Sequence, residues 1–105
     1  MKDSATNQVN FAIKRLDAIS DNQKIMMYMN ISALHYPNYF YISGEKKDSV
    51  MTQAAALRYV DGELARLFKA FQKKGDTFVI CCSDHGTCYG EDGVLYHGVN
   101  HPIVN

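Results

Sequence analysis

An apolar run ends on an acidic residue and a histidine, and these two side chains are the best suited to chemistry. The run covers residues 79–82 (Val-Ile-Cys-Cys) and is followed by Ser83, Asp84, His85 and Gly86. Buried parallel strands have this composition, and ligands in open α/β sheets gather at the carboxyl ends of strands. A carboxylate oxygen and an imidazole nitrogen together suit zinc, manganese or a similar ion. The pattern predicts a metal site, with a plain turn as the alternative.

These residues also carry a resemblance to a known superfamily. Ser83-Asp84-His85-Gly86, an acidic glycine-rich stretch at 90–93, and His97-Gly98 follow one another along the chain. This order resembles the C-terminal metal-binding motif of the alkaline phosphatase superfamily, which includes the sulfatases. Residues 84–93 (Asp-His-Gly-Thr-Cys-Tyr-Gly-Glu-Asp-Gly) fit a string carried by an uncharacterised bacterial branch of metalloenzymes.

The resemblance implies an α/β fold with three α/β/α layers and parallel strands. Residues 1–105 would form a single partial domain, the C-terminal portion of a larger catalytic domain. The implied function is a metal-dependent hydrolase or transferase that acts on small-molecule phosphate or sulfate esters. Zinc or manganese is the expected divalent metal, with calcium or magnesium as alternatives. Family nucleophiles lie upstream, so no catalytic nucleophile is assigned and the isolated chain is expected to be inactive.

The resemblance also assigns roles to individual residues. Asp84 and His85 would ligate the ion that activates the nucleophile, and His97 would ligate a metal as the family's downstream histidine. His101 lies four residues beyond His97, and only one of the two is expected to be a ligand. His97 is favoured because His97-Gly98 is more similar to the motif, and a surface loop histidine is the alternative for either residue.

His35 lies in a stretch rich in aromatic residues, at 34–41. Sulfatase-like members carry a histidine here that contacts the anionic group of the substrate. Two-zinc members carry Asp-x-x-x-His instead, but this chain has Asn30 five residues before His35 and no Asp. The resemblance therefore implies a substrate-binding His35. The alternative is that the ring only packs among the neighbouring tyrosines.

Two non-catalytic functions remain as alternatives. Cys82, His85 and Cys88 form a Cys-x2-His-x2-Cys string that could bind a structural zinc ion with His97 or His101. Against this, Cys82 lies within the predicted strand and is expected to be buried. The other alternative is a degenerate domain that serves as an interaction surface.

Composition excludes several partners. The net charge is zero, with 11 basic and 11 acidic residues, so a nucleic-acid-binding face is not expected. No apolar run approaches the length of a membrane span. Three cysteines, two of them adjacent, favour a reducing, cytoplasmic location. An incomplete domain would expose its core, so self-association is also expected.

Periodicity predicts the elements that position these residues. Residues 7–20 have a helical period, and residues 24–32 and 76–82 are predicted strands. A long helix is predicted from Asp48 or Ser49 to Gly75, with an apolar stripe that continues to Phe71. The order helix, strand, helix, strand predicts parallel strands joined by a right-handed crossover. The predicted stripe consists of Val50, Ala54, Leu57, Val60, Leu64, Leu67, Phe68 and Phe71.

Overall fold

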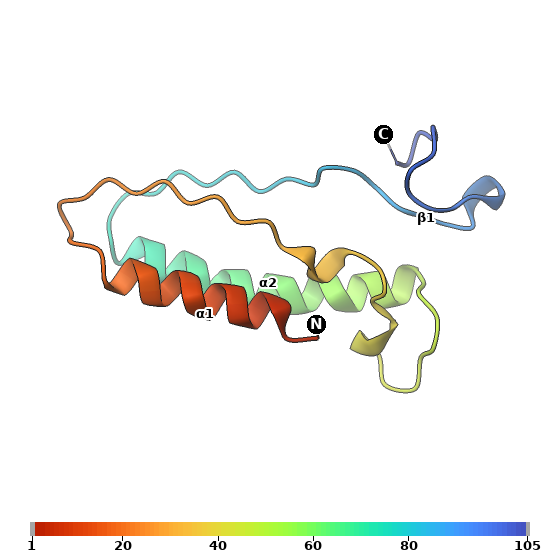
Figure 1. The fold of residues 1–105 in the computed structure, drawn as a ribbon, viewed down its shortest axis with the longest axis horizontal. Helices are drawn as coiled ribbons and strands as arrows, with labels where there is room; N and C mark the ends of the chain where they lie inside the picture. The colour runs from red at the N-terminus through yellow and green to blue at the C-terminus, as the bar shows by residue number, and fades with distance from the viewer. Residues whose placement is uncertain (1, 105) are drawn as a thin grey trace.

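The structure, a computed structural model, describes residues 2–104, and two long helices form its main body (Figure 1). The helices are α1 (Ser4–Asp17) and α2 (Val50–Gln72), and they run side by side in the same direction. Short 3-10 helices follow as η1 (Ser32–Leu34), η2 (Tyr39–Tyr41) and η3 (Glu91–Gly93). The described residues contain one sheet, an antiparallel pair of β1 (Cys88–Tyr89) and β2 (Leu95–Tyr96).

Both ends of α2 follow from local sequence. Ser49 has an extended backbone, and its side chain accepts a hydrogen bond from the Thr52 N–H at 3.3 Å. In return the Thr52 hydroxyl accepts one from the Ser49 N–H at 2.8 Å, which completes a capping box. Gly75 lies just beyond the helix with φ +126°, a conformation that glycine adopts without strain. The predicted start and stop of this helix are confirmed.

The core lies between the two helices. Val9 and Leu16 of α1 are fully buried and pack with Leu67 of α2. A second cluster joins Ala5 and Val60 to η1, and it accounts for α1 beginning at Ser4 rather than at residue 7.

The predicted apolar stripe of α2 is correct only in part. Val60 and Leu67 are buried, whereas Val50 is 59% and Leu57 is 56% exposed. The prediction merged two apolar faces of the helix, and only one of them meets α1. The N-terminal part of the predicted stripe is therefore wrong.

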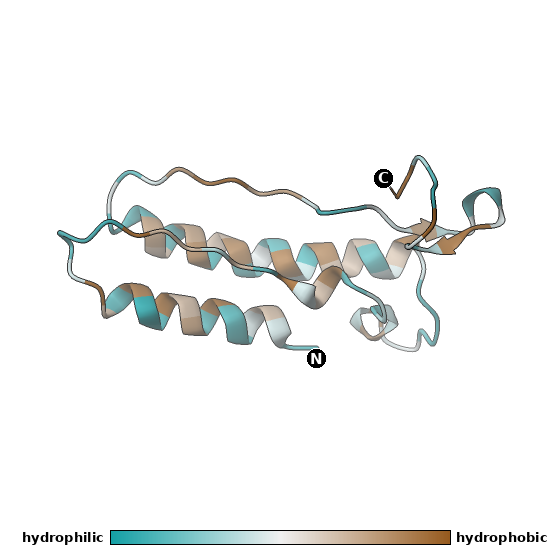
Figure 2. Ribbon diagram, turned by 45° about the horizontal axis from the view of Figure 1, so that its top comes forward, coloured by the Kyte–Doolittle hydropathy of each residue, from teal (hydrophilic) through white to brown (hydrophobic). Residues whose placement is uncertain are grey.

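The two predicted strands are extended but unpaired. Residues 24–31 lie along the helices, where Ile25 and Met27 pack on the core while Met26 is 96% exposed. Residues 76–83 run in the same direction and are exposed throughout, with Phe78 89% exposed (Figures 1 and 2).

No ladder joins the two segments, so the predicted parallel sheet and three layers are not formed within residues 2–104. The predicted burial of Cys82 is wrong, because Cys81 and Cys82 are both exposed. In the same range, no helix is long and apolar enough to cross a membrane.

Candidate functional site

Residues 84–104, here called the hairpin lobe, follow the exposed extended segment and close on themselves. The Gly86 N–H donates to the Val104 carbonyl oxygen at 3.0 Å. A Cβ atom on Gly86 would lie 1.8 Å from the Ile103 carbonyl oxygen, so no larger residue fits there. Within the lobe, Cys88 and Tyr96 face each other across the β1–β2 pair. This closure fixes where the side chains of the lobe point.

Two histidines of this lobe, His85 and His97, meet a third, His35, from a distant part of the chain. His35 Nε2 lies 3.3 Å from His97 Nε2, although 62 residues separate them in sequence. The ring centroid of His97 lies 4.4 Å from that of His85. These three residues, here called the imidazole cluster, unite the predicted substrate-binding histidine with two predicted metal ligands.

Backbone carbonyls fix the tautomer of two of these rings. His35 Nδ1 lies 2.6 Å from the Tyr36 carbonyl oxygen, and His85 Nδ1 lies 2.7 Å from that of Gly86. A carbonyl oxygen only accepts, so Nδ1 carries the proton in both rings and Nε2 keeps its lone pair. An imidazole oriented this way presents Nε2 as a metal ligand or hydrogen-bond acceptor.

Asp84 is positioned by its own neighbours and is mostly exposed. Its Oδ1 accepts a hydrogen bond from the His85 N–H at 3.0 Å and lies 3.8 Å from His85 Nε2. Asp84 is 88% exposed and His85 is 36% exposed, so both are open to solvent. Over residues 2–104, no three His, Cys, Asp or Glu side chains are arranged to hold a metal ion. The predicted ligands thus supply suitable donor atoms without forming a complete coordination set.

A polar network connects the loop that carries His35 to the lobe that carries His97. Buried Asn38 accepts from the Thr52 hydroxyl at 2.6 Å and donates to Gln53 Oε1. The Tyr89 hydroxyl of β1 donates to the same Gln53 oxygen at 2.8 Å. Burial raises the pKa of the Tyr89 phenol and outweighs the opposite effect of its hydrogen bond with Asn38, so the hydroxyl stays protonated as a donor.

Aromatic contacts strengthen this connection. The ring centroids of Tyr36 and Tyr96 lie 4.6 Å apart, and the His97 centroid lies 5.2 Å from that of Tyr36. Asp48 Oδ1 accepts the backbone N–H of Asn38 and of Tyr39 at 2.7 and 2.8 Å, which fixes the loop. His35 is therefore held next to His97 by contacts on both sides.

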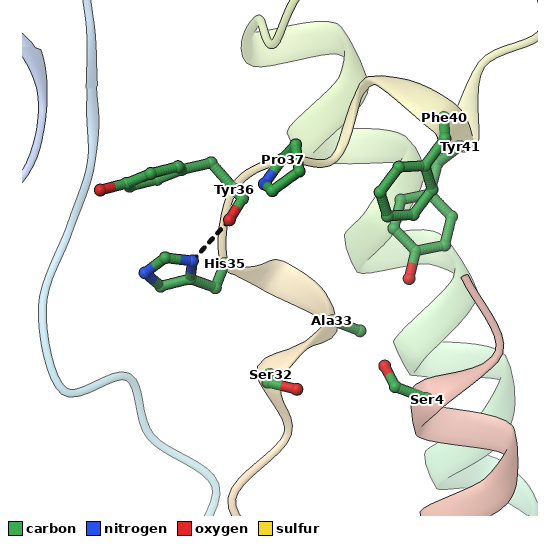
Figure 3. Close-up of a pocket in the computed structure, with 8 residues that line it drawn as sticks. All are labelled: Ser4, Ser32, Ala33, His35, Tyr36, Pro37, Phe40 and Tyr41. Carbon is green, nitrogen blue, oxygen red and sulfur yellow. Dashed lines mark hydrogen bonds between the residues drawn. The ribbon is translucent and has the colours of Figure 1, made fainter. Parts of the chain in front are cut away.

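A small pocket lies behind His35. Its volume is about 130 Å³, and its lining comes from α1, η1, the loop that follows η1, and η2 (Figure 3). His35 and Tyr36 lie on one side of the view, and Phe40 and Tyr41 lie on the other. Burial raises the pKa of the Tyr41 phenol, with Tyr59 and Asp3 acting in the same direction. The volume of this pocket is close to that of an engineered apolar cavity of about 150 Å³ that binds benzene.

The sequence did not predict the surroundings of His101. This ring contacts Cys88 and Asp92, not the imidazole cluster. Asp92 Oδ2 lies 3.1 Å from His101 Nε2. Cys82 is exposed, and no three donor side chains are arranged to hold a metal ion over residues 2–104, so the Cys82, His85 and Cys88 string forms no zinc site there. Only contacts between distant residues reveal this arrangement, and no spacing in the sequence would have found it.

Comparison with known proteins identifies a protein family. The model of the Sulfatase family matches residues 3–103, nearly the whole chain. No curated protein and no solved structure matches it.

Proposed function

This chain belongs to the Sulfatase family, and we propose that it supplies part of the site of a metal-dependent hydrolase of sulfate or related phosphate esters. Members of this family typically use a divalent metal and act on small-molecule esters. The family also makes hydrolase chemistry more consistent with the chain than the two non-catalytic alternatives. We further propose that the ester is a sulfate or a phosphate and that the group is transferred to water or to another acceptor. We also propose a cytoplasmic location.

One observation carries the proposal, namely the meeting of His35 Nε2 and His97 Nε2 at 3.3 Å. Two nitrogen ligands at about 2.0–2.1 Å from a tetrahedral ion are also about 3.3 Å apart, so His35 has two candidate roles, as a contact of the ester beside an ion bound by His97 or as a further ligand of that ion. The same distance places a group bound at His97 within hydrogen-bonding reach of His35. The donor atoms therefore fit a divalent ion, with manganese or zinc preferred for a mixed oxygen and nitrogen set.

Asp84, His85 and His97 are the proposed ligands, and His35 is proposed to contact the anionic group of the ester. When bound, the ion would activate a nucleophile and screen the charge that develops on the sulfuryl or phosphoryl group. The backbone carbonyls of Tyr36 and Gly86 hold the His35 and His85 rings with Nε2 available. The aromatic pocket behind His35 would receive the apolar part of the ester.

Metal titration tests the ligand set directly. We expect the full chain to bind Zn²⁺ or Mn²⁺ in isothermal titration calorimetry, and the Asp84→Ala/His85→Ala double variant to lose that binding. Asp61→Ala is the matched control, because Asp61 is an exposed carboxylate on α2. Equal metal affinity in the double variant and the wild type would refute the ligand assignment.

The His35→Ala variant separates its two candidate roles. Loss of metal binding would make His35 a ligand, whereas unchanged metal binding with a raised KM would make it a substrate contact. The KM measurement requires a protein that contains this chain together with a nucleophile. With metal, that protein is expected to hydrolyse 4-nitrophenyl sulfate or 4-nitrophenyl phosphate. Turnover of neither ester would contradict the proposed function.

A further inference from the structure

His101 differs from the other histidines of the lobe because both of its ring nitrogens are engaged. Nε2 lies 3.1 Å from Asp92 Oδ2, and Nδ1 lies 3.3 Å from Cys88 Sγ. The Ile103 N–H donates to the same Nδ1 at 3.2 Å. Only 12% of the His101 side chain is exposed. The ring is thus enclosed by three parts of the lobe.

These partners determine the protonation of the ring. A backbone N–H only donates, so Nδ1 must be an acceptor and the proton of neutral His101 is on Nε2. Nε2–H therefore donates to Asp92, and the Cys88 thiol donates to Nδ1. The two nitrogens point to opposite sides of the ring, so Cys88 and Asp92 cannot bind one ion together with His101.

A nucleophilic role for Cys88 does not fit this environment. A thiol, an imidazole and a carboxylate in this order resemble an activated nucleophile in composition. However, Cys88 is fully buried, and its burial raises the pKa of the thiol, with Glu91 and Asp92 acting in the same direction. An activated cysteine needs a lowered pKa and access to its substrate. The group is therefore a structural hydrogen-bond centre.

The position of this centre in the chain gives it a function. Cys88 belongs to β1 and Asp92 to η3, and the strand that leads to His97 comes between η3 and His101. The contact of Gly86 with Val104 closes the same lobe independently. We propose that His101 is a positioning residue that holds His97 against His35 and His85. Its effect on metal binding rests on the proposed function, whereas its effect on geometry does not.

Two variants of Asp92 test the hydrogen bond without disturbing the backbone. Asp92 has φ +49°, in the left-handed region that both Asn and Gly adopt readily. Asp92→Asn keeps an oxygen acceptor for His101 Nε2–H, and Asp92→Gly removes it. His101→Ala removes the ring itself. We expect Asp92→Asn to behave like the wild type and the other two variants to behave alike.

The first measurement is made without metal. NMR should detect a nuclear Overhauser effect between the ring protons of His35 and His97, whose centroids lie 5.2 Å apart. Asp92→Asn should retain this signal, and Asp92→Gly and His101→Ala should lose it. Retention of the signal in Asp92→Gly, or its loss in Asp92→Asn, would overturn the positioning role. Because Asp92→Gly leaves the ring in place, the test stands even if His101→Ala fails to fold.

The second measurement is the affinity for Zn²⁺. Removal of a hydrogen bond that orients a metal site costs about 10- to 100-fold in affinity, and we expect this loss in Asp92→Gly but not in Asp92→Asn. Wild-type affinity in Asp92→Gly would overturn the link from His101 to the site. A wild-type chain that binds no metal would instead contradict the proposed function, and the NMR test would still decide the positioning role.

Discussion

The imidazole cluster and the surroundings of His101 lie in the same part of the molecule but use histidine differently. In the cluster, His35 and His85 each use Nδ1 for a backbone carbonyl, so Nε2 keeps its lone pair, which in His35 faces His97 Nε2 at 3.3 Å. His101 instead uses both nitrogens for partners within its own lobe. His35 and His85 are also exposed, whereas His101 is mostly enclosed.

This difference indicates which histidines can take part in chemistry. A ring with a free Nε2 lone pair next to solvent can accept a metal ion or a substrate. A ring with both nitrogens engaged gains stability from its contacts and would lose them on binding a ligand. The comparison predicts that substitutions in the cluster affect binding, whereas substitutions around His101 affect geometry first.

The largest expected effect is loss of metal binding in His97→Ala. His97 contacts both other members of the cluster, so its removal deletes a ligand and the contact with His35. We expect Zn²⁺ affinity in titration calorimetry to fall by at least about 100-fold, the upper end of the loss for a residue that only orients a ligand. Helix content in circular dichroism should stay unchanged, because neither long helix contains His97. Wild-type affinity would remove His97 from the ligand set.

A pair of glycine substitutions should have opposite effects on stability. In Gly86→Ala, the new Cβ would meet the Ile103 carbonyl oxygen at 1.8 Å, and such overpacking costs about 1–3 kcal/mol. In Gly62→Ala, the new Cβ has nothing within 4 Å inside α2, so the helix should gain about 0.5–1 kcal/mol. Chemical denaturation measures both changes.

The glycine pair also sharpens the comparison between regions. Only Gly86→Ala should disturb the NMR signal between His35 and His97, because Gly86 closes the lobe. A Gly86→Ala variant as stable as Gly62→Ala would show that the close approach of Ile103 is not required.

Thr52→Val tests the network on the other side of the cluster. The Thr52 hydroxyl bonds Asn38 and completes the cap of α2 with Ser49, and both Asn38 and Thr52 are fully buried. Leaving buried Asn38 without this partner costs about 1–3 kcal/mol. Thr52→Ser keeps the hydroxyl and is the matched control. Denaturation midpoints that are equal for the two variants would contradict the importance of this bond.

The sequence predicted the parts of the fold that depend on neighbouring residues. Ser49 and Gly75 delimit α2 through local hydrogen bonds and backbone freedom, so their roles could be read without a structure. Whether residues 24–31 and 76–83 pair as strands depends on contacts outside each segment, and in the structure they do not pair. For this reason the apolar pattern identified two extended segments but not their exposure or their lack of pairing.

The same limit applies to the site. The family resemblance selected His35, His85 and His97, and the fold brings these three rings together. It offered His101 only as a second candidate ligand, because spacing does not reveal which way a ring faces. The bonds from Ile103 and Asp92 to His101 depend on closure of the lobe, so only the folded chain shows them.

The exposed extended segment should promote self-association. Phe78 and Ile80 are 89% and 76% exposed, next to backbone groups that no strand pairs within residues 2–104. Unpaired apolar edges of this kind tend to associate with one another. We expect the chain to form oligomers in sedimentation, and Ile80→Lys to shift them toward monomer. A wild-type chain that is monomeric at high concentration would contradict this expectation.

The smallest expected effect is an acid-dependent change at the start of the hairpin. Glu91 accepts hydrogen bonds from its own N–H and from that of Tyr89, and these bonds lower the pKa of its carboxyl group, with a smaller contribution from His101. A lowered pKa in the folded state means that the carboxylate adds stability above its ordinary value of 4.5 and loses it as the pH falls through the folded value. The Tyr89 amide proton should therefore shift in NMR below pH 4.5, where the carboxylate becomes protonated. In Glu91→Gln this shift should be absent, because the amide side chain does not titrate. A shift of equal size in both proteins would assign it to another group, such as Asp92.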